Sequence, residues 1–201
     1  VPSVKDSLKT LAICKKINKT LTQKQKVIVL IKLLELVGSD KNFSAQRMEI
    51  VSTVSTVFNI SQEEYKLIES FVLANSVATL NAPNILIASE TDKSGGHQLK
   101  HIHAHLDGHI VFLQVNNVGM YFTKYIGADA NTLNGFIMQP ERIYLFSHGS
   151  TIKTQGGNAL YYSDLVAEFN NEIHATKLSF IAEIDEFRFK NGAVGIRNIK
   201  I

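Results

Sequence analysis

The sequence is poor in the residues that mark several classes of protein. It has one cysteine, Cys14, no tryptophan, and three prolines, at positions 2, 83 and 140, among its 201 residues. A single thiol excludes an internal disulfide framework and a four-thiolate zinc site, and it fits a reducing compartment. So few prolines exclude collagen-like and proline-rich sequences. What remains is an ordinary globular composition, with 45% hydrophobic and 19% charged residues, which argues against general disorder.

Long apolar runs are also missing. The most apolar stretch, 27–37, has 11 residues and is interrupted by Lys32 and Glu35, whereas a membrane-spanning helix needs about 20. The opening residues VPSVKDSLK lack the charged start and apolar block of a secretory signal. The chain does not begin with Met, and we therefore expect it to be a piece of a longer protein.

Positive charge is concentrated near the start of the chain. Eight lysines lie between Lys5 and Lys32, together with a single acid, Asp6. Such a cluster attracts anionic lipid or nucleic acid, because clustered cations release bound counterions from their partner. The alternative is that these lysines form the solvated face of a helix, which is the commoner arrangement.

The first 76 residues have the apolar spacing of helices. Apolar side chains recur every three or four positions, so each set lies on one stripe of a helix. Thr22 with Gln25, and Ser61 with Glu64, fit the capping box of a helix N-terminus. The pattern predicts a four-helix bundle, with helices over 4–21, 22–38, 44–58 and 62–76.

The apolar period changes to two after residues 81–84, which include Pro83. Turn pairs such as Asp107-Gly108 and Asn134-Gly135 separate short apolar runs, which is typical of a β-sandwich or barrel. A hairpin with its turn at Asn191-Gly192 is predicted at the end of the chain. The strands that we expect cover 85–87, 110–115, 119–125, 136–138, 143–146, 151–153, 160–162, 178–181, 184–189 and 194–201.

The helical half resembles the TerB-like bundle of tellurite-resistance proteins. The resemblance covers about residues 22–75 and depends on the segments DKNFSAQR at 40–47 and FNISQEE at 58–64. In that family a loop of the type Asp-x-x-apolar-Ser-x-x-Glu can hold a metal. Here Arg47 stands in place of the final acid, which removes an oxygen ligand. We therefore expect no Ca²⁺ or Mg²⁺ on this half of the chain.

The middle of the chain resembles a forkhead-associated β-sandwich. The segments LNGFI at 133–137 and SHGSTI at 147–152 are similar to a late hairpin and a following strand of that family. The Gly-Arg and Ser-x-x-His elements with which the family binds phosphothreonine do not precede them. We therefore predict the sandwich without phosphopeptide recognition.

The last 15 residues, FRFKNGAVGIRNIKI at 187–201, resemble the opening hairpin of an ABC-type ATPase domain. In that family the second aromatic residue of the first strand stacks on adenine, and this position falls on Phe189. The whole layout resembles the N-terminal region of large ABC transporter ATP-binding proteins from Bacteroidetes-type bacteria, on segments 21–30, 149–153 and 161–164. No phosphate-binding Gly-x-x-x-x-Gly-Lys-Ser/Thr loop occurs in the sequence.

These resemblances imply an α+β fold with three parts: a TerB-like helical bundle over 1–80, a forkhead-associated-like β-sandwich over 81–175, and the opening strands of an ATPase domain over 176–201. They imply an accessory or regulatory region of an ATP-binding protein, cytoplasmic at the inner face of the membrane. ATP and Mg²⁺ would be cofactors of the parent protein, while this fragment would bind no cofactor and hydrolyse no ATP. The implied partners are the rest of the ATPase, its membrane domain and other protein domains, and a homodimer is a further candidate. Nucleic acid is less favoured.

Five histidines lie within thirteen residues: 97, 101, 103, 105 and 109. If the segment is extended, the imidazoles of His101, His103 and His105 share one face, where they could hold Zn²⁺ or Cu²⁺. The alternatives are a half-exposed strand with a histidine-rich face and a surface that gains charge at acidic pH. The second function hypothesis is accordingly a stand-alone binding module for a metal ion, anionic lipid or nucleic acid.

Overall fold

The computed structural model describes residues 12–13, 15–39, 45–91, 99–157, 159–170 and 183–200. Contacts within the chain divide it into two compact units, Val1–Phe169 and Asn170–Ile201. The first unit contains the longer helices and two β-sheets, and the second contains a β-hairpin. The predicted α+β class with a C-terminal hairpin is therefore confirmed.

The helices of the first unit follow the predicted spacing closely. They are α2 (Gln23–Gly38), α3 (Ala45–Val57) and α4 (Gln62–Leu73), and residues 15–20 are helical as well. Helix α4 ends three residues earlier than predicted, because the backbone of Ala74 is extended. The loop with the TerB-like metal motif falls largely on 40–44, which lie outside the described residues.

Two sheets follow the helices. The larger is a five-stranded sheet of order β2-β1-β3-β4-β7, in which β1 and β2 are parallel and the other neighbours antiparallel. The smaller is a four-stranded antiparallel sheet of order β6-β5-β8-β9. The strands are β1 (Ile85–Ser89), β2 (Lys100–His103), β3 (His109–Val115), β4 (Met120–Ile126), β5 (Thr132–Leu133), β6 (Phe136–Ile137), β7 (Tyr144–Phe146), β8 (Thr151–Lys153) and β9 (Ala159–Tyr161).

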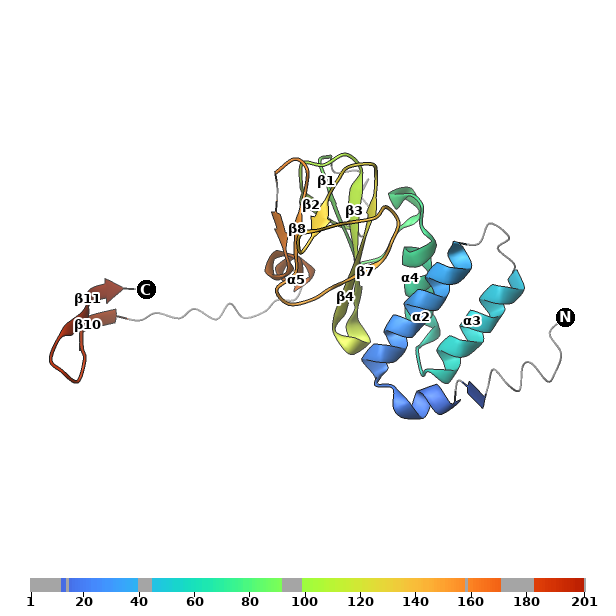
Figure 1. The fold of residues 1–201 in the computed structure, drawn as a ribbon, viewed down its shortest axis with the longest axis horizontal. Coiled ribbons are helices and arrows are strands. Elements are labelled where there is room, and N and C mark those ends of the chain that lie inside the picture. The colour runs from blue at the N-terminus through green and yellow to red at the C-terminus, as the bar shows by residue number, and fades with distance from the viewer. Residues whose placement is uncertain are drawn as a thin grey trace. The chain divides into compact units, whose positions relative to one another are not determined.

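The five-stranded sheet is buried on both faces. Alternate side chains of a strand point to opposite faces. Ile85 and Ile87 of β1 belong to the apolar core shared with the helices, whereas Leu86 and Ala88 belong to the core shared with the second sheet. Figure 1 shows α2, α3 and α4 together on one side of this sheet. The helices, the five-stranded sheet and the smaller sheet therefore form successive layers with two cores between them.

Two strands and one α-helix were not predicted. Strands β2 and β5 are short, and helix α5 (Tyr162–Asn170) occupies a region expected to be all-β. Helix α5 buries Leu165 and Phe169, which are four residues apart and close the second core. Two buried positions are too few to establish a helical period in the sequence, and the expectation of an all-β segment over 81–175 was wrong for this reason.

Side chains of α2 bind the backbone of the sheet layer at Ile143, immediately before β7. Lys32 donates from Nζ to the carbonyl oxygen of Ile143 over 3.1 Å, and Glu35 accepts from the Ile143 amide at 2.7 Å. The two side chains also pair with each other at 2.5 Å. Strand β7 is an edge strand of the sheet, and these bonds satisfy backbone groups next to that edge.

The second unit is the predicted hairpin of β10 (Glu183–Arg188) and β11 (Val194–Lys200). Its turn lies at Asn191-Gly192, where Gly192 has φ +82°, a conformation that glycine adopts without strain. Glu186 on β10 pairs with Arg197 on β11, with contacts of 2.5 and 3.0 Å. The strand expected over 178–181 lies outside the described residues.

Candidate functional site

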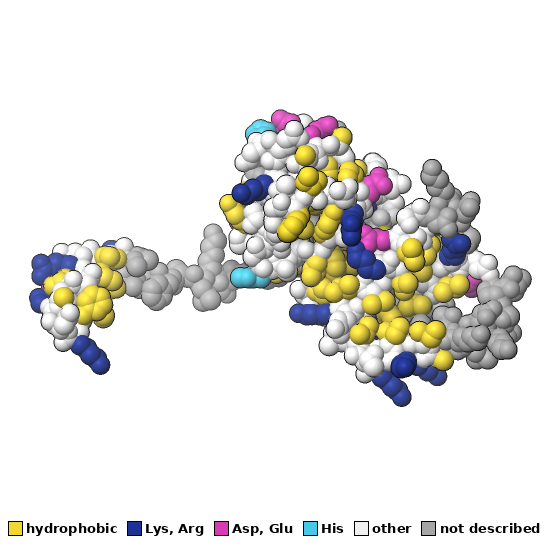
Figure 2. Space-filling view, in the orientation of Figure 1, with side chains coloured by type: hydrophobic (Ala, Val, Ile, Leu, Met, Phe, Trp, Pro, Cys, Tyr) yellow, Lys and Arg dark blue, Asp and Glu magenta, His cyan; other side chains and the backbone are white. Residues whose placement is uncertain are grey.

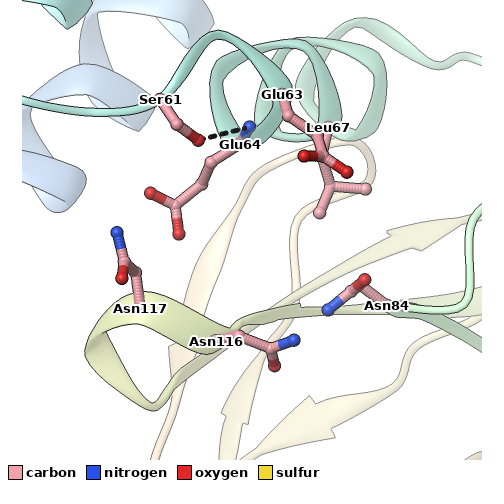
Figure 3. Close-up of a pocket in the computed structure, with 7 residues that line it drawn as sticks. All are labelled: Ser61, Glu63, Glu64, Leu67, Asn84, Asn116 and Asn117. Carbon is pink, nitrogen blue, oxygen red and sulfur yellow. Dashed lines mark hydrogen bonds between the residues drawn. The ribbon is translucent and has the colours of Figure 1, made fainter.

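The first unit has a pocket where the start of α4 faces the turn between β3 and β4. Its volume is about 430 Å³. Figure 3 shows side chains from α4, from the turn and from the segment before β1 converging on it. We call it the amide pocket, and it is lined by Ser61, Glu63, Glu64, Leu67, Asn84, Asn116 and Asn117.

A helix cap, a 3₁₀ turn and a backbone hydrogen bond position the residues that line the amide pocket. Ser61 is the N-cap of α4, and its hydroxyl accepts from the amide of Glu64 at 3.1 Å. Asn116 and Asn117 open η2 (Asn116–Val118), a 3₁₀ turn that ends at Gly119 in the left-handed region, with φ +59°. Asn84 is held by its carbonyl oxygen, which accepts from the Gln114 amide at 2.9 Å.

The two predicted capping boxes differ in the structure. At α2 the box is complete, since Thr22 accepts from the amide of Gln25 while the Gln25 side chain accepts from the Thr22 amide at 2.9 Å. At α4 only the serine half forms. The carboxylate of Glu64 instead extends toward Asn117, as Figure 3 shows. Its Oε2 is shielded from solvent and has no hydrogen-bond partner in the described part of the chain.

The lining of the pocket is polar and carries the negative charge of two glutamates, while its amides and its hydroxyl can both donate and accept hydrogen bonds. Its lining residues are two glutamates, three asparagines, one serine and one leucine, and none of them is basic. Such a set favours a ligand with positive charge and several N–H donors.

Two of the three predicted metal-binding histidines, His103 and His105, contact each other, while His101 contacts Ser89. His101 lies in β2, and its Nε2 is 3.0 Å from the hydroxyl of Ser89. The rings of His103 and His105 meet edge to face at 4.9 Å, and Nδ1 of His105 is 3.4 Å from Glu90. Among the described residues, no three His, Cys, Asp or Glu side chains lie together in a way that could hold a metal ion. The metal site stays a prediction.

Phe189, the predicted adenine-stacking residue, follows β10 directly. Its side chain is 56% exposed, and its ring meets that of Phe187 edge to face at 5.4 Å. The ring also lies close to Gly195 of β11. Its role in nucleotide binding stays a prediction.

The lysine-rich start of the chain divides into exposed and buried side chains. Lys15, Lys16, Lys19 and Lys24 are exposed, in agreement with a solvated helix face. Lys26, in contrast, is 7% exposed. The binding of an anionic partner by these lysines stays a prediction.

Sequence reasoning missed the amide pocket. In the sequence, Ser61 and Glu64 indicated a capping box, and no pattern brought them together with Asn84, Asn116 or Asn117. An incomplete capping box has no signature in the sequence, because the same Ser-x-x-Glu spacing fits both outcomes. The juxtaposition of α4 with the β3–β4 turn depends on tertiary packing.

No helix in the described part of the chain is long and apolar enough to cross a membrane. In comparisons with known proteins, no protein-family model, curated protein or solved structure matches this chain.

Proposed function

We propose that this chain is the accessory N-terminal region of the ATP-binding protein of an ABC transporter, whose parent drives membrane transport by hydrolysing ATP. The observation that carries the proposal is the hairpin β10–β11, a compact unit of its own with aromatic-x-aromatic spacing at Phe187 and Phe189. This spacing and the Gly192 turn support the resemblance to the opening hairpin of an ABC-type ATPase domain.

The hairpin has the surface expected of strands that belong to a larger sheet. Phe187, Phe189, Val194, Ile196 and Ile199 are all 37–56% exposed. An isolated two-stranded hairpin is marginally stable in water, and apolar side chains on both strands favour burial against further strands. In the parent, Phe189 would stack on adenine, and the phosphate loop that holds ATP and Mg²⁺ would come from the sequence after residue 201.

We further propose a TerB-like fold for the bundle and a forkhead-associated-like fold for the sheets. The pairing of β5 with β6 around Asn134-Gly135 and the strand β8 coincide with the segments that carry the second resemblance. The bonds from Lys32 and Glu35 to the Ile143 backbone tie helices to sheet, which supports a role as one rigid accessory body.

This body would dock other protein domains at the inner face of the membrane. Figure 2 shows apolar side chains gathered over α2 and α3, where Leu36 and Ile50 are 69% and 42% exposed. In the smaller sheet, Phe136 and Ile137 of β6 are 80% and 63% exposed. Exposed apolar groups of this kind favour contacts with partner proteins.

The decisive test is the coding sequence beyond codon 201. A Gly-x-x-x-x-Gly-Lys-Ser/Thr motif within a few dozen codons supports the proposal, and a stop codon overturns it. In the full-length protein, Phe189→Ala should raise the KM for ATP roughly tenfold, since stacking on a base contributes about 1–3 kcal/mol. Phe136→Ala removes another exposed ring, in the smaller sheet of the first unit, and should leave that KM unchanged. Residues 1–201 alone should not hydrolyse ATP.

The exposed lysines favour a second candidate, a stand-alone module that binds an anionic lipid surface or nucleic acid. Replacing Lys15, Lys16 and Lys19 with glutamine would then abolish flotation with anionic vesicles or retention of nucleic acid. The same changes should have no effect on ATP use by an ABC-type parent. The two candidates are therefore separable.

A further inference from the structure

We propose that His103 and His105 form a two-histidine site for a divalent late transition-metal ion, Cu²⁺ above all. The site differs from the three-histidine arrangement expected from the sequence, because it leaves out His101. It is independent of the transporter assignment. Its elements are two exposed imidazoles on one side of the chain, a ring spacing that fits a shared ion, and a carboxylate beside one of the rings.

The backbone at the end of β2 directs both imidazoles to the same side. Ala104, which lies between them, has its side chain fully buried in the second core, and Leu106 is 6% exposed. Side chains alternate along an extended segment, and both His103 and His105 are exposed. The Ala104 amide donates to the carbonyl oxygen of Ser89 at 3.0 Å, which continues the pairing of β2 with β1. The two imidazoles are therefore carried by a segment that is held against the sheet.

The two rings have the separation that two ligands of one ion require. Their centres are 4.9 Å apart and their planes are at 88° to each other. With metal–nitrogen bonds of about 2.0–2.1 Å, imidazoles bound at a right angle or at the tetrahedral angle have ring centres roughly 4.5–5.2 Å apart. The rotation of a histidine ring about χ2 is broad, so a nitrogen of each exposed ring can turn toward the ion while the backbone stays in place.

Glu90 orients one of the two ligands. Its Oε1 lies 3.4 Å from Nδ1 of His105. A carboxylate in this position accepts from the Nδ1–H group and so makes Nε2 the ligating nitrogen, which is the usual arrangement of a metal-bound histidine. The carboxylate also places a negative charge beside the bound cation. The pair of His105 with Glu90 therefore has the chemistry of a metal ligand and its supporting group.

His101 is left out of the site by its own hydrogen bond. Its Nε2 is 3.0 Å from the hydroxyl of Ser89, and that hydroxyl donates its single hydrogen to the carbonyl oxygen of Thr91 at 2.8 Å. The hydroxyl can then only accept from His101. Nε2 of His101 accordingly carries a proton and has no lone pair for a metal.

Two imidazole ligands favour copper over other ions. Imidazole suits Cu²⁺, Ni²⁺ and Zn²⁺, and Cu²⁺ binds a given nitrogen site most tightly among the divalent first-row metals. The described residues contain no group of three metal-binding side chains, so water molecules would complete the coordination.

The test is a Cu²⁺ titration of the untagged 201-residue chain, followed by electron paramagnetic resonance of the loaded protein. We expect a site with hyperfine structure from two imidazole nitrogens, and binding weakened about tenfold or more by His103→Ala and by His105→Ala. Glu90→Gln keeps the size of the side chain without its charge and should weaken binding severalfold. His148→Ala removes another exposed imidazole and should bind Cu²⁺ as the unchanged chain does.

Two further variants separate this site from a larger histidine cluster. His101→Ala should leave the affinity unchanged, and so should His97→Ala, whose position lies outside the described residues. A loss in either variant as large as that in His103→Ala overturns the two-histidine assignment. Unchanged affinity in both His103→Ala and His105→Ala, or a copper spectrum without two coupled nitrogens, overturns the site itself. Urea unfolding of each variant without metal verifies that the fold is intact.

Discussion

Lys124, in the middle of β4, donates from Nζ to the carbonyl oxygen of Ala74, the residue that ends α4, over 2.5 Å. A second bond reaches the carbonyl of Val72 at 3.2 Å, and the ammonium lies 5.3 Å from the ring centre of Phe71. The side chain is 1% exposed. Free carbonyls at a helix C-terminus carry partial negative charge, and a buried cation therefore joins the helical layer to the sheet.

The burial of Lys124 predicts that stability rises with pH. Burial lowers the pKa of Lys124 to about 8, although the charges of Glu141 and Glu35 raise it in part. Between that value and the unfolded pKa near 10.4, the unfolded chain binds more protons than the folded chain. The unfolding free energy should therefore increase by about 3 kcal/mol across this window.

Lys124→Met removes this titration and provides the reference. Urea unfolding from pH 7 to pH 10.5 should show the increase in unfolding free energy for the unchanged chain but not for the variant. All other titratable groups are the same in the two proteins, so the difference between them isolates Lys124. If the free energy of unfolding changed with pH in the same way in both proteins, Lys124 would have an ordinary pKa in the folded chain, and the prediction would be wrong.

The hydrogen bond between Glu35 and the Ile143 amide predicts that truncating Glu35 lowers the free energy of unfolding. Glu35→Ala leaves the Ile143 amide without its charged acceptor, and we expect a loss of about 1.5–3 kcal/mol in urea unfolding. Glu49→Ala, on the exposed face of α3, should change stability by no more than about 0.5 kcal/mol. Similar losses in both variants would mean that the bond to Ile143 contributes nothing specific.

The two capping boxes predict different losses of stability when the residue at the third helical position is truncated. Gln25→Ala removes the acceptor of the Thr22 amide and should cost roughly 0.5–1 kcal/mol. Glu64→Ala should cost close to zero, because the gain from removing a buried unpaired oxygen offsets the lost interaction with the helix dipole. Thermal unfolding at pH 7 compares the two, and a larger cost at Glu64 contradicts the assignment.

Gly127 lies close to the hydroxyl of Tyr125, and we therefore expect Gly127→Ala to destabilise the fold. A methyl group at Gly127 would overlap the hydroxyl of Tyr125. That hydroxyl donates to the Asp107 carbonyl at 2.5 Å and accepts from the Asp129 amide at 2.7 Å. Displacing it breaks both bonds, and we expect a loss of about 2 kcal/mol. A melting temperature within a degree of the unchanged chain would show that the loop adjusts freely.

Much of the fold could be predicted, because its signals are local. The capping box at Thr22, the change of period after Pro83 and the turn at Asn191-Gly192 each depend on a few neighbouring residues. Helix α5 and the short strands β2 and β5 were missed for the same reason, since their apolar residues are too few to establish a period.

The candidate site was beyond prediction from the sequence. Ser61, Asn84 and Asn116 meet in one pocket although more than 20 residues separate each from the next. The three histidines of the predicted metal site are close in sequence, yet Ser89 and Glu90 engage two of them separately. Side chains that are close in sequence therefore need not form a site, and side chains that are distant in sequence can line the same pocket.

The sequence by itself determined where α2 and α4 begin and where the hairpin turns, because capping and glycine conformation act over a few residues. Tertiary structure alone decided that the five-stranded sheet is covered on both faces and that Lys124 is buried against the end of α4. It also decided that Glu64 leaves its cap for the pocket. A strand residue carries no local mark of what will cover it, because burial is set by the packing of layers that are distant in the chain.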